Sequence, residues 1–232
     1  MSGAHARITG PIYRYIDTRY PPINVFDGLY DIEKEQRLAF ALEAATNPRL
    51  ADPARRLAAL PEGSLPTTED GNGATWVMAS FVYTAERGGR FNGPELGAWY
   101  ASLEADTAIG EVAYHNARRL AASEAGFPNT IQLRELVTDL DADLLDVRGA
   151  QATSRLTDPN DYSISQAFSR ERRWPYGDPP EDGLVYDSVR AAGGTNVVLF
   201  RPRAVPLPVL QGEHRQLDWN RAGALTVTRL ST

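Results

Sequence analysis

The sequence predicts a single compact domain of the mixed α/β (α+β) class. Its 232 residues fit one such domain with insertions. Hydrophobic residues make up 42% of the chain and charged residues 23%, which is the balance of an ordinary globular protein. Segments with helical patterns and segments with strand patterns are mixed along the chain without the regular spacing of βαβ units. This irregularity favours a mixed domain over a doubly wound sheet.

The individual elements follow from hydrophobic periodicity and turn residues. In residues 31–50, Leu38, Leu42 and Ala45 share one stripe at helical spacing, and Asn47 followed by proline ends the pattern. For the apolar run over residues 74–83, periodicity does not decide between helix and strand. Further helices are expected over residues 54–60, 104–121 and 162–173, and strands over residues 97–102, 131–140, 185–189, 196–201 and 222–230.

Composition excludes several classes of function. The chain has no cysteine, which excludes disulfides, zinc–thiolate sites and cysteine nucleophiles, and its three histidines argue against a metal site. A net charge of -6 argues against direct nucleic-acid binding, although a small anionic ligand needs only a few arginines. The first 15 residues lack the apolar core of a signal peptide, and no apolar run is long enough to cross a bilayer. We therefore expect a cytoplasmic protein without membrane contact.

Residues 88–115 contain the most informative combination of side chains. Arg90 lies in a glycine-rich turn, Tyr100 in the expected aromatic strand, and Glu111 on the expected helix. Arginine binds phosphate oxygens in pairs, and an aromatic ring can cover a flat nicotinamide. A carboxylate stabilises the positive charge that develops on a ribose carbon when its bond to nicotinamide breaks. These residue types are those that cleavage of NAD⁺ requires, with NAD⁺ as a substrate and no prosthetic group.

Structural roles are the alternatives for the same residues. Arg90 could be a solvated turn arginine, and sheet core is the preferred interpretation of Trp99. Glu111 and His115 could form a surface pair one helical turn apart, and a third ligand for a metal is lacking nearby. Glu104 lies two turns from Glu111, about 10 Å along the helix, which exceeds the usual separation of glycosidase carboxylates.

The segment around Arg90, Tyr100 and Glu111 resembles the RES domain, a family named for its Arg, Glu and Ser positions. Further motifs in the same order extend the resemblance over about residues 12–202. They are Ile12-Tyr13-Arg14-Tyr15 with Arg19-Tyr20-Pro21-Pro22-Ile23, Asp161-Tyr162-Ser163 with Gln166, the run from Gly183 to Arg190, and Val198-Leu199-Phe200-Arg201-Pro202.

The resemblance implies one domain over residues 1–232, related in fold to ADP-ribosyltransferase toxins. Its core motifs would cover about residues 12–30 and 74–202, with a helical insertion over about residues 31–73. Carried over by motif, Arg14 and Arg90 would bind the phosphates, and Tyr15 and Tyr100 would flank the nicotinamide and its ribose. Glu111 would be the catalytic carboxylate, assisted by Arg90 and Tyr100.

The serine of the family motif has two candidates in this chain. Ser163 is favoured as the residue that hydrogen-bonds the substrate, and Ser188 is the alternative. Ser163 also has a structural interpretation, because Ser163 to Gln166 fits a capping box at the start of a helix.

The resemblance further implies a toxin of a type II toxin–antitoxin system. Such a toxin would cleave NAD⁺ as a glycohydrolase or phosphorylase, or would use NAD⁺ to ADP-ribosylate a cellular protein. Its partner would be an Xre-like antitoxin whose C-terminal region occludes the active site. A catalytically silent protein that only binds an antitoxin is a third hypothesis, against which the complete set of Arg14, Arg90, Tyr100 and Glu111 argues.

Overall fold

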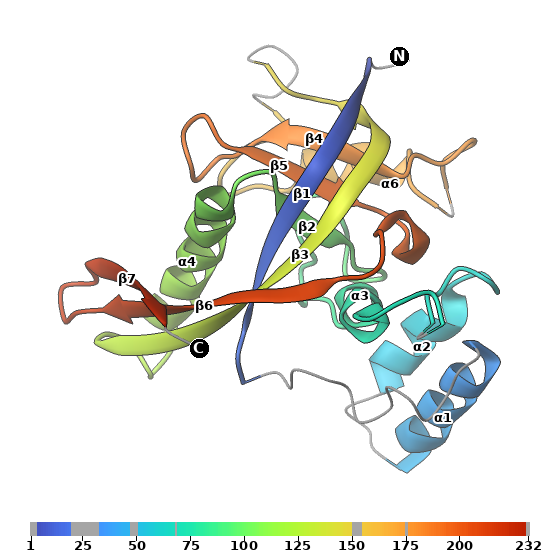
Figure 1. Cartoon of the computed structure of the whole chain (residues 1–232), viewed down its shortest axis with the longest axis horizontal. Coiled ribbons are helices and arrows are strands. Elements are labelled where there is room, and N and C mark those ends of the chain that lie inside the picture. Colours follow the sequence, from blue (N-terminus) through green and yellow to red (C-terminus); the bar gives the residue numbers. More distant parts are fainter. Residues whose placement is uncertain are drawn as a thin grey trace.

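A seven-stranded mixed sheet organises the chain (Figure 1). The computed structural model describes residues 4–19, 33–46, 51–67, 69–149, 155–174 and 176–230. The strand order is β1-β2-β5-β4-β3-β6-β7, with β3 and β4 parallel and the other pairs antiparallel. The strands are β1 (His5–Asp17), β2 (Trp99–Ser102), β3 (Asn129–Asp146), β4 (Gly183–Asp187), β5 (Thr195–Leu199), β6 (Leu210–Trp219) and β7 (Leu225–Leu230).

Five of these strands close into a ring. Strand β1 pairs with β3 along its whole length, from His5 opposite Leu145 to Asp17 opposite Leu133. It also pairs with β2 at Tyr13 and Ser102. Because β2, β5, β4 and β3 are neighbours in that order, β1 joins the first and last of them. Ring closure satisfies backbone groups that a strand edge would leave unpaired.

Two helices cover opposite faces of the β1–β3 ladder. Helix α3 (Ala74–Val82) packs with Ile8 and Ile12 in one hydrophobic cluster. Helix α4 (Ala105–Ala121) packs with Tyr13 and Tyr15 in another. Since successive side chains of a strand point to opposite faces, the even and odd residues of β1 serve different helices. The other helices in the described ranges are α1 (Glu33–Thr46), α2 (Ala51–Ala59), α6 (Ser163–Arg170) and a short 3₁₀ turn, Pro202–Ala204.

The mixed α/β class predicted from the sequence is confirmed, as are most of its elements. The ambiguous run over residues 74–83 is the helix α3, and the strand expected over residues 131–140 is the longer β3. No element was expected at β1 or β6. Gly10 and Pro11 in β1 form a dipeptide typical of a turn, yet the ladder with β3 continues through both residues.

The helix that the stripe of Leu38, Leu42 and Ala45 predicts is present as α1, but the stripe is not buried. Leu38 is 61% and Leu42 64% exposed. Arg37 instead joins α1 to the end of α2, where it donates to the carbonyl oxygens of Leu57, Leu60 and Pro61. The described part of residues 31–73 thus contains two helices, whereas its status as an insertion stays a prediction. No helix in the described ranges has the length and apolar character needed to cross a membrane.

Candidate active site

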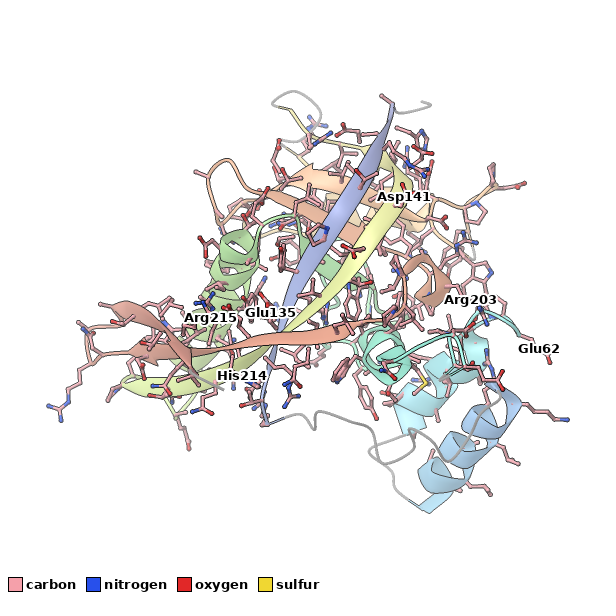
Figure 2. The ribbon with its side chains drawn as sticks, in the orientation of Figure 1. Glu62, Glu135, Asp141, Arg203, His214 and Arg215 are labelled. Carbon is pink, nitrogen blue, oxygen red and sulfur yellow. The ribbon has the colours of Figure 1, made fainter. Side chains whose placement is uncertain are left out.

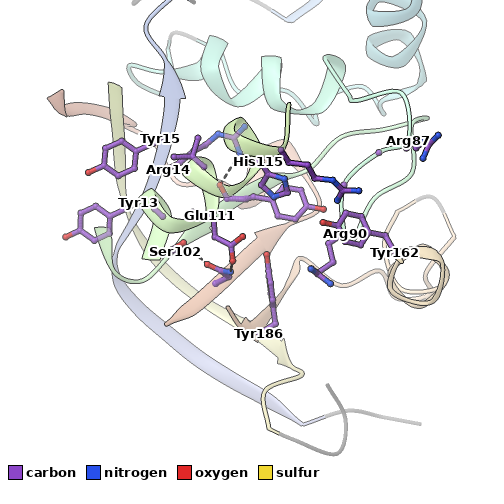
Figure 3. A pocket seen from close by; sticks show the side chains of 18 of the residues that line it. Tyr13, Arg14, Tyr15, Arg87, Arg90, Ser102, Glu111, His115, Tyr162 and Tyr186 are labelled. Atoms are coloured by element: carbon purple, nitrogen blue, oxygen red, sulfur yellow. Dashed lines mark hydrogen bonds between the residues drawn. The ribbon is translucent and has the colours of Figure 1, made fainter. Parts of the chain in front are cut away.

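A cavity of about 520 Å³ lies where β1, β2 and α4 meet the loop that follows α3 (Figure 3). Pockets for cofactor-sized ligands commonly have such a volume. Five of the predicted site residues line it, namely Arg14, Tyr15, Arg90, Tyr100 and Glu111. The fold therefore brings the N-terminal motif together with residues 88–115, from which it is separated in sequence by more than 70 residues.

The loop that carries Arg90 is held by tight backbone contacts. Gly88 has φ +71°, and a side chain on Gly89 would approach the Tyr100 hydroxyl to 2.8 Å, so both positions favour glycine. The Tyr100 hydroxyl donates to Asn92 Oδ1 and accepts from the Phe91 amide, both at 2.8 Å. Tyr100 thus lines the cavity, while these two hydrogen bonds of its hydroxyl hold the loop of Arg90 in place.

Arg90 is buried, with part of its guanidinium left for a ligand. Its Nη1 donates to the carbonyl oxygen of Asp158 at 2.6 Å, and its guanidinium lies 4.6 Å from the centre of the Tyr162 ring. Within the described ranges, Nε and Nη2 have no hydrogen-bond partner. Helix α6 supports this arrangement, because Ser165 donates to the carbonyl oxygen of Arg90 at 2.6 Å.

Arg14 reaches the cavity from β1. Its Nη1 donates to the carbonyl oxygen of Tyr100 at 3.0 Å, and its guanidinium lies 4.9 Å from the ring centre of Trp99. Burial lowers the pKa of Arg14 to about 10, a value that still leaves the guanidinium charged at neutral pH. Trp99 is 1% exposed, which confirms its interpretation as sheet core.

Glu111 is held by donors from two strands. Its Oε1 accepts from Ser188 Oγ and from Asn196 Nδ2, each at 2.7 Å. Asn196 is itself oriented by Ser102, whose hydroxyl donates to Asn196 Oδ1 at 2.6 Å. No residue of the described ranges donates to Oε2. One carboxylate oxygen is therefore fixed by the protein, and the other is left to the cavity.

Tyr15 is oriented by a buried carboxylate on β3. Its hydroxyl donates to Glu135 Oε1 at 2.6 Å, and Glu135 Oε2 accepts from the Glu213 amide at 3.0 Å. A bulge in the β3–β6 ladder at residues 134–136 makes room for Glu135, which lies near Arg215 (Figure 2). Burial, followed by the bond to Glu135, raises the pKa of Tyr15.

His115 lines the cavity one helical turn beyond Glu111. No hydrogen bond joins the two side chains, so the alternative of a Glu111–His115 surface pair is not observed. Burial lowers the pKa of His115; Glu111 opposes this effect, and Arg190 and Arg90 add to it. In the part of the chain that the structure describes, no three or more His, Asp and Glu residues form a group that could hold a metal ion.

The two candidate serines have different surroundings, and neither is among the residues that line the cavity. Ser163 is exposed at the start of α6, whereas Ser188 donates to Glu111 Oε1, so which of them serves the substrate stays a prediction. The capping box is also absent, because the N-cap is Tyr162 and makes no side-chain cap. Gln166 instead donates to the carbonyl oxygens of Arg87 and Gly89, at 2.9 and 2.8 Å.

Sequence reasoning missed several residues of the cavity, among them Tyr162, Tyr186 and Asn196. All three lie in or beside motifs that were recognised, but nothing in those motifs indicates which side chains face the cavity. Arg87 and Arg118 also line it, so that four arginines face one carboxylate, Glu111. This excess of positive charge suits an anionic ligand despite the negative net charge of the chain.

This chain is similar to a known protein sequence, to a chain of a solved structure and to one protein family. The uncharacterized protein y4oC of Sinorhizobium fredii is 27% identical over 225 residues, which cover 92% of this chain and 84% of that protein. A chain in the crystal structure of the M. tuberculosis MbcT–MbcA toxin–antitoxin complex is 14% identical, with a TM-score of 0.42 over 94% of this chain and 88% of its own length. The family model of the RES domain matches residues 68–220. The chain therefore belongs to the RES domain family.

Proposed function

We propose that this protein is the toxin of a toxin–antitoxin pair and that it cleaves the bond between nicotinamide and ribose in NAD⁺. The observation that supports the proposal is a single cavity that contains arginines, tyrosine rings and a carboxylate fixed on one oxygen. Each of these groups matches one part of the substrate. Membership of the RES domain family supports the toxin role.

Arginines and tyrosines would bind the substrate. Arg14 and Arg90 would bind the pyrophosphate, because guanidinium groups pair with phosphate oxygens and stay charged at neutral pH. The rings of Tyr15 and Tyr100 would cover the nicotinamide and its ribose. NAD⁺ would thereby be oriented with its anomeric carbon toward Glu111.

Glu111 would stabilise the charge that develops during bond cleavage. When the C1′–N bond breaks, its electron pair leaves with nicotinamide, which departs as a neutral base and needs no general acid. The positive charge that remains on the ribose faces Oε2 of Glu111, while Ser188 and Asn196 hold Oε1. An acceptor oxygen then bonds to C1′, and the proton of that acceptor passes to solvent.

An assay for free nicotinamide tests the proposal. Purified protein is incubated with NAD⁺, with and without inorganic phosphate, and the products are separated by chromatography. Glu111→Gln is expected to lower the rate at least about 100-fold, the loss typical when a group that stabilises transition-state charge is removed. Because glutamine keeps an oxygen that can accept from Ser188 and Asn196, the fold should persist. Glu124→Gln, the same change at an exposed position outside the cavity, is the control.

The outcomes separate the competing functions. Labelled NAD⁺ in a cell lysate would leave label on a protein band if the reaction were ADP-ribosyl transfer to a protein. NAD⁺ binding without turnover would support a catalytically silent protein. Full activity of Glu111→Gln, or no nicotinamide release by the wild type under any of these conditions, would contradict the proposed mechanism.

An antitoxin is the proposed protein partner, and it would act by covering the cavity. Co-expression with an adjacent Xre-like open reading frame should restore growth to cells that express the wild type. Glu111→Gln should allow growth without that partner. Toxicity that persists in the Glu111→Gln variant would separate toxicity from the proposed chemistry.

A further inference from the structure

Tyr186 on β4 is a buried residue whose hydroxyl the preceding account does not use. The residue is 5% exposed, and its ring packs edge-on against Phe91 at a centroid distance of 4.8 Å. Its side chain lines the cavity. Within the described ranges the hydroxyl makes no hydrogen bond. A tyrosine hydroxyl that opens into a cavity without a protein partner is available to bond to a ligand there.

The position of this hydroxyl specifies what it can bind. Figure 3 shows the Tyr186 side chain between Glu111 and Arg90, with its hydroxyl end directed into the cavity. In the proposed function, on which this inference rests, Glu111 serves the anomeric carbon of the ribose and Arg90 serves a phosphate. The atoms of NAD⁺ that connect these two points are those of the ribose 5′-phosphate unit.

We infer that Tyr186 is a substrate-binding residue whose hydroxyl donates a hydrogen bond to an oxygen of the ribose 5′-phosphate unit next to the nicotinamide. Burial raises the pKa of Tyr186 well above 10, so the hydroxyl keeps its proton and acts as a donor. Tyr186 would thus contribute to the selection of a 5′-phosphorylated nicotinamide riboside.

Tyr100 in the same cavity provides a contrast. Its hydroxyl already bonds to Asn92 and to the Phe91 amide, so its removal disrupts the loop even without a ligand. The Tyr186 hydroxyl has no such role in the described structure. Removal of each hydroxyl in turn therefore separates a structural hydroxyl from one that awaits a substrate.

The test compares Tyr186→Phe with Tyr100→Phe, with Tyr176→Phe as the control. Tyr176 is 51% exposed and lies outside the cavity. Tyr186→Phe keeps the ring against Phe91, so its melting temperature should equal that of the wild type. Its kcat/KM for nicotinamide release from NAD⁺ should fall about tenfold, the effect expected for one lost hydrogen bond. Tyr100→Phe should lower the melting temperature, and Tyr176→Phe should change neither quantity.

Three outcomes decide the matter. If Tyr186→Phe loses about tenfold in kcat/KM at an unchanged melting temperature, the assignment is supported. If the wild type is active and Tyr186→Phe matches it within twofold, the assignment fails while the proposed function stands. If the wild type neither cleaves NAD⁺ nor binds ADP-ribose in a calorimetric titration, the proposed function and this assignment fail together.

Discussion

Replacement of Glu135 by leucine would test how the fold orients Tyr15. Both residues are buried, at 7% and 6% exposure. Glu135 accepts from the Tyr15 hydroxyl at 2.6 Å and from the Glu213 amide at 3.0 Å. In Glu135→Leu, both donors would lose their acceptor in a region with little access to water.

The magnitude follows from the two donors. Each unsatisfied buried donor costs about 1–3 kcal/mol, so Glu135→Leu should lower the free energy of unfolding by about 2–6 kcal/mol. Tyr15→Phe in the same background removes one of these donors and should restore about 1–3 kcal/mol. The two substitutions should therefore show a coupling energy of at least about 1 kcal/mol.

Urea unfolding followed by tryptophan fluorescence gives the free energies for the wild type, the two single variants and the double variant. The KM for NAD⁺ of the single variants should also rise, because the Tyr15 ring is then no longer held in the cavity wall. Additive effects of the two substitutions, or a loss below about 1 kcal/mol in Glu135→Leu, would refute this account of the buried pair.

Further predictions concern the supports of the cavity. Gly194→Ala would place a Cβ 2.3 Å from Thr107 Oγ1. The free energy of unfolding measured in urea should therefore fall by about 1–3 kcal/mol, and kcat should fall as well. Thr107→Ala in that background should restore part of the stability. Gln166→Leu removes the hydrogen bonds that hold the loop before Arg90. The KM for NAD⁺ should therefore rise severalfold, with a smaller change in kcat. An unchanged KM would contradict this role of Gln166. The pKa of His115 is lowered, so the unfolded chain binds a proton near pH 6.5 before the folded chain does. The free energy of unfolding should therefore fall as the pH drops below about 6.5, and His115→Gln should reduce this dependence between pH 7.5 and pH 5.5.

Local patterns were sufficient to predict most helices and strands, because periodicity and turn residues act over a few neighbouring positions. They failed where tertiary pairing determines the outcome. The dipeptide Gly10-Pro11 is typical of a turn, but 13 residues of β1 pair with β3 and carry the strand through it. Likewise, the stripe that includes Leu38 and Leu42 has helical spacing, yet spacing alone does not say whether a neighbouring element covers it.

The candidate site was predictable to the extent that its residues are close in sequence. Arg90, Tyr100 and Glu111 come from one short segment, in which a turn, a strand and a helix follow each other and face the same cavity. The geometry of Arg14 depends on the β1–β3 ladder and the β1–β2 pairing, which bring it to the carbonyl oxygen of Tyr100. From the sequence, only the family resemblance assigns Arg14 to the same site as Arg90.

The two serines illustrate what a local pattern leaves undetermined. Ser163 lies next to Tyr162 and precedes Gln166, so its surroundings carry a strong signal for a helix start. Ser188 lies in the turn between β4 and β5, and it meets Glu111 because that turn packs closely on α4 at Gly194 and Thr107. Such an approach between segments about 80 residues apart has no signature at either position alone. Ser188→Ala is therefore expected to lower kcat more than Ser163→Ala, because it frees the carboxylate on which the proposed reaction depends.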